Sequence, residues 1–455
     1  MPDHVHLARA LFGTSMGFHI IYATLGVGIP FMVTIAEVTY ALTGDSDYAV
    51  MAKRWTRGFT VLLAVSITTG TTVALQLSLL WPKFMQLVGQ VIALPFLLEI
   101  FAFFLEALFM SIYVYAADRI PRRWRIVSVL LVAIGAASSA LLITDANAFM
   151  NAPQGFRMVN GKAVDIHPWQ AVFNPALPTS DFHVLMTAYM SVGFITAAVA
   201  AYGLLKKSHT DRERQHQYKS LMLSLALGGV FGMIAAISGD RAAKHLAAYQ
   251  PEKLAVAEGL FNTQSHAPLV IGGWVSGSRQ DVIGGIKVPD FLSWLATDRV
   301  DGVVKGLNDF PRDTWPPLFL HLFFDGMVGI GTMLIFLAIF AWLVKTIRRR
   351  EQFPFPKWLL CATVVSGPLA VIAIELGWIY ACMGRQPWII YHVMRTADAV
   401  TSSPYVGWMF FLFIMLYLML AIGSITVLRS YFSRHPLSDD IEPNTPKPRR
   451  AVWLP

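Results

Sequence analysis

The stretch VIAIELGWIYACMGRQPW at residues 371–388 puts a carboxylate, Glu375, inside an apolar helix that ends in an Arg-Trp cluster. A charged side chain in hydrocarbon is costly, so such a carboxylate indicates a functional site with a partner. These residue types, with His and Met beside them, are what haem iron and its supply of protons require. Other apolar segments carry the remaining candidates, namely His19, Glu99, Glu106, His183 and Met327.

The composition is that of a membrane protein. Of the 455 residues, 55% are hydrophobic and only 14% are charged, whereas a soluble domain has about 25% charged residues. The two cysteines, Cys361 and Cys382, lie at opposite ends of one expected helix, roughly 30 Å apart, which is too far for a disulfide. No Cys-x-x-Cys-His motif is present, which excludes covalently attached haem. The first residues lack a basic region before a short apolar run, so we expect no cleaved signal peptide.

Nine apolar runs are long enough to cross a bilayer, which takes about 20 residues. The sixth run is short and rich in glycine. The sequence therefore predicts an all-α polytopic membrane protein with nine transmembrane helices. The runs lie near residues 14–41, 58–80, 93–116, 126–146, 182–205, 219–237, 318–344, 358–380 and 405–428.

The distribution of Lys and Arg predicts the orientation of the chain. Most of the 36 basic residues lie in the loops after helices one, three, five and seven and in the C-terminal tail. Because cytoplasmic loops carry the excess of Lys and Arg, we expect the N-terminus outside and the C-terminus inside. The net charge of +8 then anchors the chain at the inner leaflet, so lipid is an expected partner and nucleic acid is not.

The spans and loops divide the chain into four parts. Residues 1–237 hold helices one to six, and residues 318–428 hold helices seven to nine. Between them, residues 238–317 form a long outer segment of the kind that is usually functional, with a helix expected only around Glu252–Leu260. Residues 429–455 combine prolines with scattered charges, which favours a disordered cytoplasmic tail. The sequence has no internal repeat, so an inverted-repeat transporter gains no support.

The expected orientation gives each polar residue a depth in the membrane. Counted along helices that rise about 1.5 Å per residue, all six candidate side chains fall in the outer half of the bilayer. A random scatter of tolerated polar residues would not segregate in this way. His321 and His392 lie at the outer boundary and are interpreted as structural.

Each candidate also has a purely structural interpretation. His183 alone would more often be an interfacial histidine than a ligand, and Met327 alone would more often fill a gap in the core. Glu99 and Glu106 could hydrogen-bond to neighbouring helices, and Glu375 could be a structural buried acid. The combination favours haem, because haem b centres need pairs of axial ligands from facing helices and His/Met is one such pair.

Several motifs match a known family. On these motifs the chain resembles subunit I of the cytochrome bd-type quinol oxidases, from His19 to about Pro404. The wording MRTADAV at residues 394–400 looks most like the cyanide-insensitive oxidase branch. The motifs are GFH at 17–19, AFFLE at 102–106, His183 at the start of helix five, MVG at 327–329, ELGW at 375–378 and GRQPW at 384–388.

The resemblance implies three haems. His183 and Met327 would be the axial ligands of a low-spin haem b, through which electrons enter. His19 and Glu375 would bind the two high-spin haems, one a haem b and the other a haem d or a third haem b. Which of these two residues serves which haem stays open.

The resemblance also implies roles for acidic and basic residues. Glu99 and Glu106 would lie on the proton route or beside the oxygen-reducing haem, although their spacing of seven departs from the eight of some members. In the 238–317 segment, the quinol loop, Lys253 and Glu258 would contact quinol. Without the family, this pair would be an exposed face of an amphipathic helix.

Arg385 and Trp388 would hold haem propionates at the membrane interface. The structural alternative is simple snorkelling and an aromatic belt. One departure from the family concerns charge, because Asp325 stands two residues before Met327, where a basic residue is expected in many relatives.

The function implied by the resemblance is that of a terminal quinol oxidase in the bacterial cytoplasmic (inner) membrane. Quinol would be oxidised at the outer face and oxygen reduced to water, which builds a proton gradient without pumping. The implied partners are a second oxidase subunit (subunit II) and a small single-span subunit. The rival functions are a cofactor-free proton-coupled transporter, which would use the three glutamates as a relay, and a cofactor-free membrane anchor.

Overall fold

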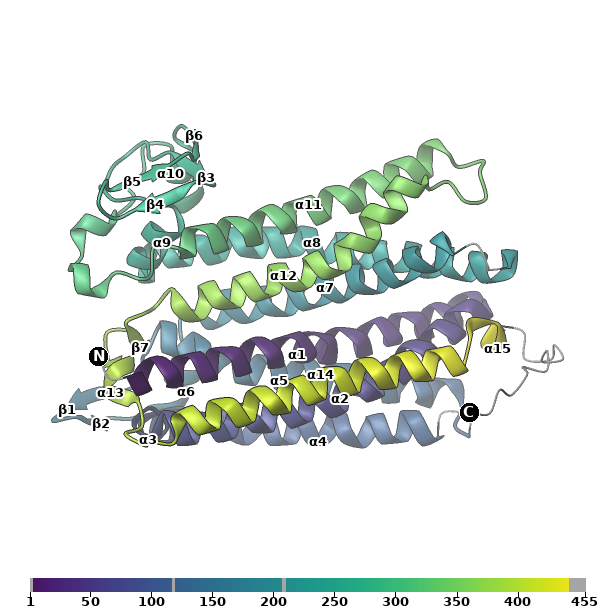
Figure 1. Cartoon of the computed structure of the whole chain (residues 1–455), viewed down its shortest axis with the longest axis horizontal. Helices are drawn as coiled ribbons and strands as arrows, with labels where there is room; N and C mark the ends of the chain where they lie inside the picture. Colours follow the sequence, from purple (N-terminus) through teal and green to yellow (C-terminus); the bar gives the residue numbers. More distant parts are fainter. Residues whose placement is uncertain (1–2, 117–118, 207–209, 442–455) are drawn as a thin grey trace.

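The structure is a computed structural model that describes residues 3–116, 119–206 and 210–441. Within these ranges, nine helices are long and apolar enough to cross a membrane, which confirms the expected number of spans. Figure 1 shows them running side by side along the long axis of the molecule. They are α1 (Asp3–Thr43), α2 (Ser46–Leu80), α4 (Ala93–Ala116), α5 (Arg122–Asn151), α7 (Leu177–Leu205), α8 (Asp211–Tyr249), α11 (Leu320–Ile347), α12 (Lys357–Met383) and α14 (Val406–Arg434).

Several helices extend well beyond the apolar runs. The 41 residues of α1 span about 60 Å, twice the roughly 30 Å of hydrocarbon. The sixth helix is the clearest correction, because α8 covers 39 residues and not the short run expected at 219–237. A capping box between Thr210 and Glu213 starts α8. Beyond 237 the helix continues through charged residues to Tyr249, so the segment expected at 238–317 begins within α8.

The C-terminal boundary is also corrected. The ninth helix does not stop near 428 but continues to Arg434, and a short helix α15 follows at Leu437–Ile441. Asp440 of α15 accepts hydrogen bonds from Arg54 at 2.8 Å and from Arg57 at 3.1 Å, both on α2. Residues 429–441 are therefore not a disordered tail, and residues 442–455 lie outside the described residues.

The transmembrane helices pack in two groups. Helices α7, α8, α11 and α12 contact one another, and α1 contacts α2, α5 and α14, while α4 packs on α5. Contacts of α1 with α7 and α12 join the two groups (Figure 1). Glycine allows the closest approach, since a Cβ on Gly193 of α7 would lie 2.6 Å from the backbone of Gly228 on α8.

Most of the small elements lie at one end of the bundle, beside the N-terminal end of α1 (Figure 1). The connections between helices therefore alternate in size, long at this end and short at the other. The short helix α3 at Pro82–Val91 was not expected from the sequence. The other elements here are β1 (Arg157–Val159), β2 (Lys162–Val164), α6 (Pro168–Val172), β7 (Trp388–Ile390), β8 (Met394–Arg395) and α13 (Thr396–Ala399).

The segment between α8 and α11, residues 250–319, is an ordered unit with its own apolar core. Its strands form two antiparallel pairs, β3 with β6 and β4 with β5. The core includes Val270, Val275 and Val282 from the strands and Leu307. The elements of the unit are α9 (Pro251–Ala257), β3 (Leu269–Ile271), β4 (Trp274–Ser276), β5 (Asp281–Ile283), β6 (Ile286–Val288), α10 (Phe291–Thr297), η1 (Leu307–Asp309) and η2 (Arg312–Thr314).

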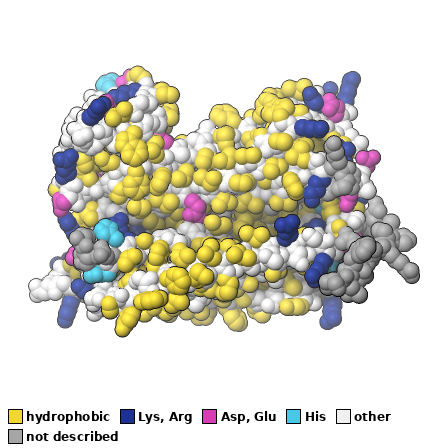
Figure 2. Space-filling view, in the orientation of Figure 1, with side chains coloured by type: hydrophobic (Ala, Val, Ile, Leu, Met, Phe, Trp, Pro, Cys, Tyr) yellow, Lys and Arg dark blue, Asp and Glu magenta, His cyan; other side chains and the backbone are white. Residues whose placement is uncertain are grey.

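The surface of the whole molecule has the charge distribution of a membrane protein. Figure 2 shows a broad hydrophobic surface between two ends where Lys and Arg gather.

Candidate functional site

The imidazole of His19 on α1 is held in one tautomer. Its Nδ1 lies 2.9 Å from the hydroxyl oxygen of Thr69 on α2. That hydroxyl already donates its proton to the carbonyl oxygen of Val65 at 2.9 Å, so its oxygen accepts a hydrogen bond from Nδ1–H. The lone pair of Nε2 is then left free, which is how a ligating histidine is usually prepared by its partner. A Cβ on Gly70 would lie 3.2 Å from the ring, so this glycine makes room for it.

Glu375 on α12 approaches α1 close to His19. A Cβ on Gly17 would lie 3.1 Å from its Oε2. The other oxygen, Oε1, is buried and has no hydrogen-bond partner among the described residues. A buried carboxylate oxygen without a partner is costly, and a ligated iron would remove this cost. Every residue of the stretch 373–379 around Glu375 is half-buried.

His183 on α7 repeats the arrangement of His19. Its Nδ1 lies 2.9 Å from the hydroxyl of Ser238 on α8, and that hydroxyl donates to the carbonyl oxygen of Ala235 at 3.0 Å. Nδ1 therefore carries the proton and Nε2 keeps its lone pair. Gly239 makes room for the ring, because a Cβ there would lie 3.3 Å from Cε1.

Met327 on α11 points its thioether at α12. A Cβ on Gly377 would lie 2.9 Å from the sulfur, so only glycine leaves space there. Glu375, two residues before Gly377 on the same helix, directs its carboxyl group at Gly17 of α1 instead. The backbone of α12 therefore separates the sulfur of Met327 from the carboxyl group of Glu375. Two imidazoles with free Nε2 atoms, a thioether beside a glycine and an unpartnered carboxylate oxygen fit haem iron. In the described part of the chain, no group of three or more His, Cys, Asp or Glu residues could hold a bare metal ion.

Glu99 and Glu106 lie where α4 packs on α5. Glu99 accepts a hydrogen bond from Ser139 of α5 at 3.0 Å. A hydrogen bond to a neighbouring helix is what the structural interpretation of Glu99 expects. The side chain of Glu106 is only 6% exposed. A Cβ on Gly135 would lie 2.9 Å from the backbone nitrogen of Glu106, so the two helices approach closely at this residue.

Lys253 on α9 is buried, with 5% exposed. Its Nζ donates to the carbonyl oxygen of Ala381 at 3.1 Å and to Asn151 Oδ1 at 3.3 Å. Burial, together with the neighbouring charge of Arg385, lowers the pKa of Lys253 to about 7. An exposed amphipathic face is therefore the wrong interpretation of this residue.

Glu258, directly after α9, is buried to the same extent, with 5% exposed. Burial raises the pKa of its carboxyl to about 8, and the negative charge of Asp325 adds to the effect. Glu258 lines a cavity of about 120 Å³ whose other walls include Asn262, Gln264 and Gln280. One water needs roughly 10–15 Å³ by this measure, so the cavity has room for several waters beside the carboxyl group.

Arg385 is buried beside the C-terminal end of α5. Its Nη1 donates to Asn147 Oδ1 at 2.6 Å, while its Nε is buried without a partner among the described residues. An unpartnered guanidinium N–H suits an anionic group such as a carboxylate. Asn147 and Asn151 hold Arg385 and Lys253, and the sequence analysis missed both, although their i, i+4 spacing at the end of an apolar helix could have shown them.

Trp388 does not share these contacts. Its ring lies 5.2 Å from the guanidinium carbon of Arg395 and packs edge-on against His392. Arg395 in turn pairs with Asp313 at 2.7 Å. A role for Trp388 in haem binding stays a prediction.

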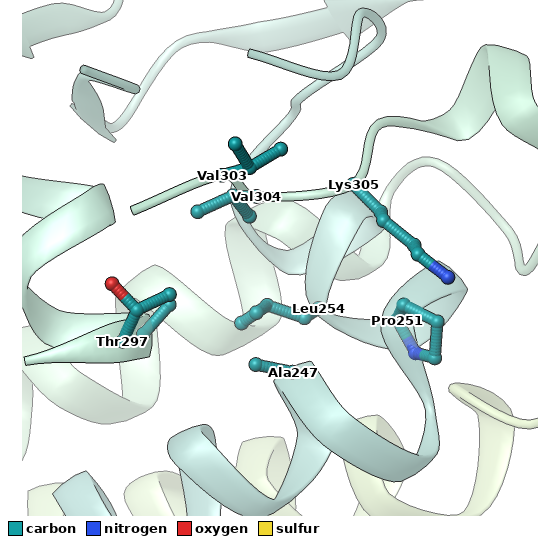
Figure 3. A pocket seen from close by; sticks show the side chains of 8 residues that line it. Ala247, Pro251, Leu254, Thr297, Val303, Val304 and Lys305 are labelled. Atoms are coloured by element: carbon teal, nitrogen blue, oxygen red, sulfur yellow. The ribbon is translucent and has the colours of Figure 1, made fainter. Parts of the chain in front are cut away.

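Two of the expected site residues have other hydrogen-bond partners. Lys253 bonds to Asn151 and Ala381 and not to Glu258, and His183 bonds to Ser238. A second small pocket, of about 100 Å³, contains none of the predicted site residues. Figure 3 shows it between α8, α9, α10 and the segment 303–305, with Leu254 and Val304 in its wall.

Comparisons with known proteins agree with this arrangement. The family described as cytochrome bd terminal oxidase subunit I matches residues 7–436. A Bacillus subtilis (strain 168) chain named as a cytochrome bd menaquinol oxidase subunit I is 50% identical over 439 residues, 96% of this chain and 99% of the relative. A cytochrome bd ubiquinol oxidase subunit 1 of the same organism is 31% identical over 418 residues, 89% of this chain and 88% of the relative.

A solved structure, that of the bd oxidase from Geobacillus thermodenitrificans, shares the fold. It aligns with a TM-score of 0.90 and 46% identity, over 95% of this chain and 99% of the solved one. The nine spans and the family matched are thus consistent with one another. The chain belongs to the cytochrome bd terminal oxidase subunit I family and is a multi-pass membrane subunit of a haem-containing oxidoreductase.

Proposed function

We propose that this subunit oxidises quinol at α9 and passes the electrons to haems held by His19, His183, Met327 and Glu375. The observation that carries the proposal is the pair of prepared imidazoles together with the unpartnered oxygen of Glu375. Bound haem supplies one-electron transfer and the reduction of oxygen to water. As a terminal oxidase subunit I, the chain works with a subunit II, and we propose that a small single-span subunit joins them.

We propose two haems b and a third haem that is d-type or b-type. His183 and Met327 come from helices of one group, α7 and α11, and would hold the low-spin haem b. His19 and Glu375 come from α1 and α12, the contact between the two groups, and would hold the high-spin haems. Arg385, with its free Nε, would bind a haem propionate.

Lys253 and Glu258 would act on quinol as proton acceptors. The two hydroxyl groups of a quinol lie on opposite edges of its ring, so two acceptors can serve them without touching each other. Each acceptor has a pKa near neutrality, of about 7 for Lys253 and about 8 for Glu258, which is the range that suits proton transfer. The waters that the cavity beside Glu258 can hold would carry the proton away.

The sidedness of the reaction follows from charge. We place the 250–319 unit and the N-terminal end of α1 outside, because the opposite ends of the helices carry most of the Lys and Arg. Quinol protons then leave outside, and the protons consumed in making water enter from the inside past Glu106 and Glu99. This separation builds a proton gradient without a pump, and the cofactor-free transporter has no observation in its favour.

The quinol itself can be ranked. The relative that is 50% identical is named for menaquinol and the one that is 31% identical for ubiquinol. We therefore propose menaquinol as the substrate. Membership of the cyanide-insensitive branch, suggested by residues 394–400, stays a prediction.

The proposal is tested by oxygen consumption of the purified oxidase with reduced short-chain menaquinol or ubiquinol. Glu258→Gln should lower the quinol-dependent rate by about a hundredfold, the usual contribution of a positioned base, with the haem spectrum unchanged. Asp301→Asn, an exposed acid of the same unit, should leave the rate unchanged. A full rate in Glu258→Gln would contradict the assigned role.

A further inference from the structure

His321, at the outer end of α11, is fully buried and contacts two other segments. Its relative exposure is 0%. Nδ1 lies 2.6 Å from the carbonyl oxygen of Ala257, the residue before Glu258, and Nε2 lies 3.0 Å from the carbonyl oxygen of Gly272. One imidazole thus connects α11 with the end of α9 and with the turn between β3 and β4.

Both of these contacts are with backbone carbonyl oxygens, so the two ring nitrogens lie against two chain segments at once. Asp325, one turn further along α11, lies beside the ring, with its Oδ2 3.4 Å from Nε2.

The turn between β3 and β4 is held on both sides by this pair. Gly272 donates its N–H to Asp325 at 2.5 Å and its carbonyl oxygen accepts from His321. Gly272 has φ +67°, a conformation that favours glycine. Asp325, which stands where the sequence analysis expected a base, therefore has partners within the chain.

The start of α9 has its own anchor. The hydroxyl of Tyr380 on α12 donates to the carbonyl oxygen of Lys253 at 3.3 Å. Side chains of α11 and α12, the helices that carry Met327 and Glu375, thus hold the backbone beside both proposed proton acceptors. The charged group beside His321 is Asp325 on its own helix, and Glu258 follows Ala257, whose carbonyl oxygen His321 contacts.

We propose that His321 is a positioning residue for quinol oxidation, which through its two ring nitrogens fixes the end of α9 and the turn between β3 and β4 and so holds Glu258 at its cavity. This inference rests on the proposed oxidation of quinol at α9. It assigns a role to a histidine that the sequence analysis interpreted as structural.

The test compares His321→Gln with His266→Gln in the purified oxidase complex. His266 is an exposed histidine of the same unit, paired with Asp290. Glutamine keeps N–H donors but can make only one of the two contacts. The measurements are amide hydrogen exchange of peptides covering 251–262 and 268–276, the KM for short-chain quinol, and oxygen consumption with an artificial one-electron dye that releases no quinol protons.

In His321→Gln, exchange in both peptides and the quinol KM should each rise by at least about tenfold, as the loss of a buried hydrogen bond that leaves a carbonyl oxygen unsatisfied implies. The dye-driven rate and the haem spectrum should match those of His266→Gln. Unchanged exchange and an unchanged quinol KM would overturn the proposal. If the wild type oxidised the dye but no quinol, the proposed function would fail, while the exchange result would still test the contact.

If His321→Gln does not assemble, amide hydrogen exchange of the wild type tests the proposal instead. Amides of 251–258 should exchange at least about tenfold more slowly than those of the exposed turn 277–280. Equal rates in the two segments would overturn the proposal without any variant.

Discussion

At the residue scale, the account depends on two buried groups that change charge near neutral pH. Glu258 can accept a proton only as a carboxylate, which forms above its raised pKa of about 8. Lys253 can accept one only as the neutral amine, which forms above its lowered pKa of about 7. Both acceptor forms therefore increase as the pH rises through this window.

This gives a pH dependence with a definite sign. The kcat/KM for quinol should rise from about pH 6 to about pH 8.5, because kcat/KM follows the free enzyme's essential groups. The measurement is the quinol-dependent rate at low substrate across this range. In Glu258→Gln the part of the rise centred near 8 should disappear. A profile that falls with pH, or an unchanged one in the variant, would contradict the proton-acceptor role.

The sequence selects the proposed haem ligands but does not show how they are held. His19, His183, Met327 and Glu375 were identifiable because polar atoms and sulfur stand out in apolar helices. The hydrogen-bond partners of the two histidines could not be identified, because Thr69 and Ser238 are ordinary hydroxyl residues of other helices, far away in the sequence. The full burial of His321 depends on a folded 250–319 unit, which no local pattern shows.

At the element scale, the length and hydropathy of the apolar runs predicted the transmembrane helices, but the sequence analysis missed the helices that are polar. The transmembrane helices continue past the membrane through charged residues, as α8 does to Tyr249, where periodicity in apolar residues no longer marks a helix. The three-residue strands β3 to β6 are too short to show alternation in sequence. Gly273 and Gly284, both with positive φ, lie in the connections from β3 to β4 and from β5 to β6, where the chain passes from one strand pair to the other.

The packing of α7 on α8 predicts an intolerant glycine. Gly193→Ala would bring a Cβ to 2.6 Å from the backbone of Gly228, and backbone cannot move aside as a side chain can. Overpacking of this kind costs about 1–3 kcal/mol. The midpoint of thermal unfolding, measured on the purified protein in detergent, should therefore fall.

The matched control is Gly329→Ala on α11, where a Cβ would meet nothing within 4 Å. It should leave the midpoint unchanged or slightly higher, since alanine favours helix. Equal midpoints for the two variants would show that α7 and α8 are not in close contact at Gly193.

At the scale of the whole molecule, the account places the α9 end outside and the short connections inside. In a chain with Cys361 and Cys382 replaced by Ser, a single cysteine at Lys287 should react with a membrane-impermeant thiol reagent in intact cells. A cysteine at Arg349, at the opposite end of the bundle, should react only after lysis. Both positions are exposed, so the reverse pattern would contradict the orientation and the direction of the proton gradient.

The central claim is that separate membrane helices hold haem iron through the side chains named here. It is tested most directly by the dithionite-reduced minus oxidised spectrum of the purified protein, compared between wild type, Met327→Leu and Met333→Leu, a methionine of the same helix that is 47% exposed. The account predicts haem bands in the wild type and in Met333→Leu, and loss of the low-spin component alone in Met327→Leu. A wild type without haem bands, or a full low-spin band in Met327→Leu, would contradict it.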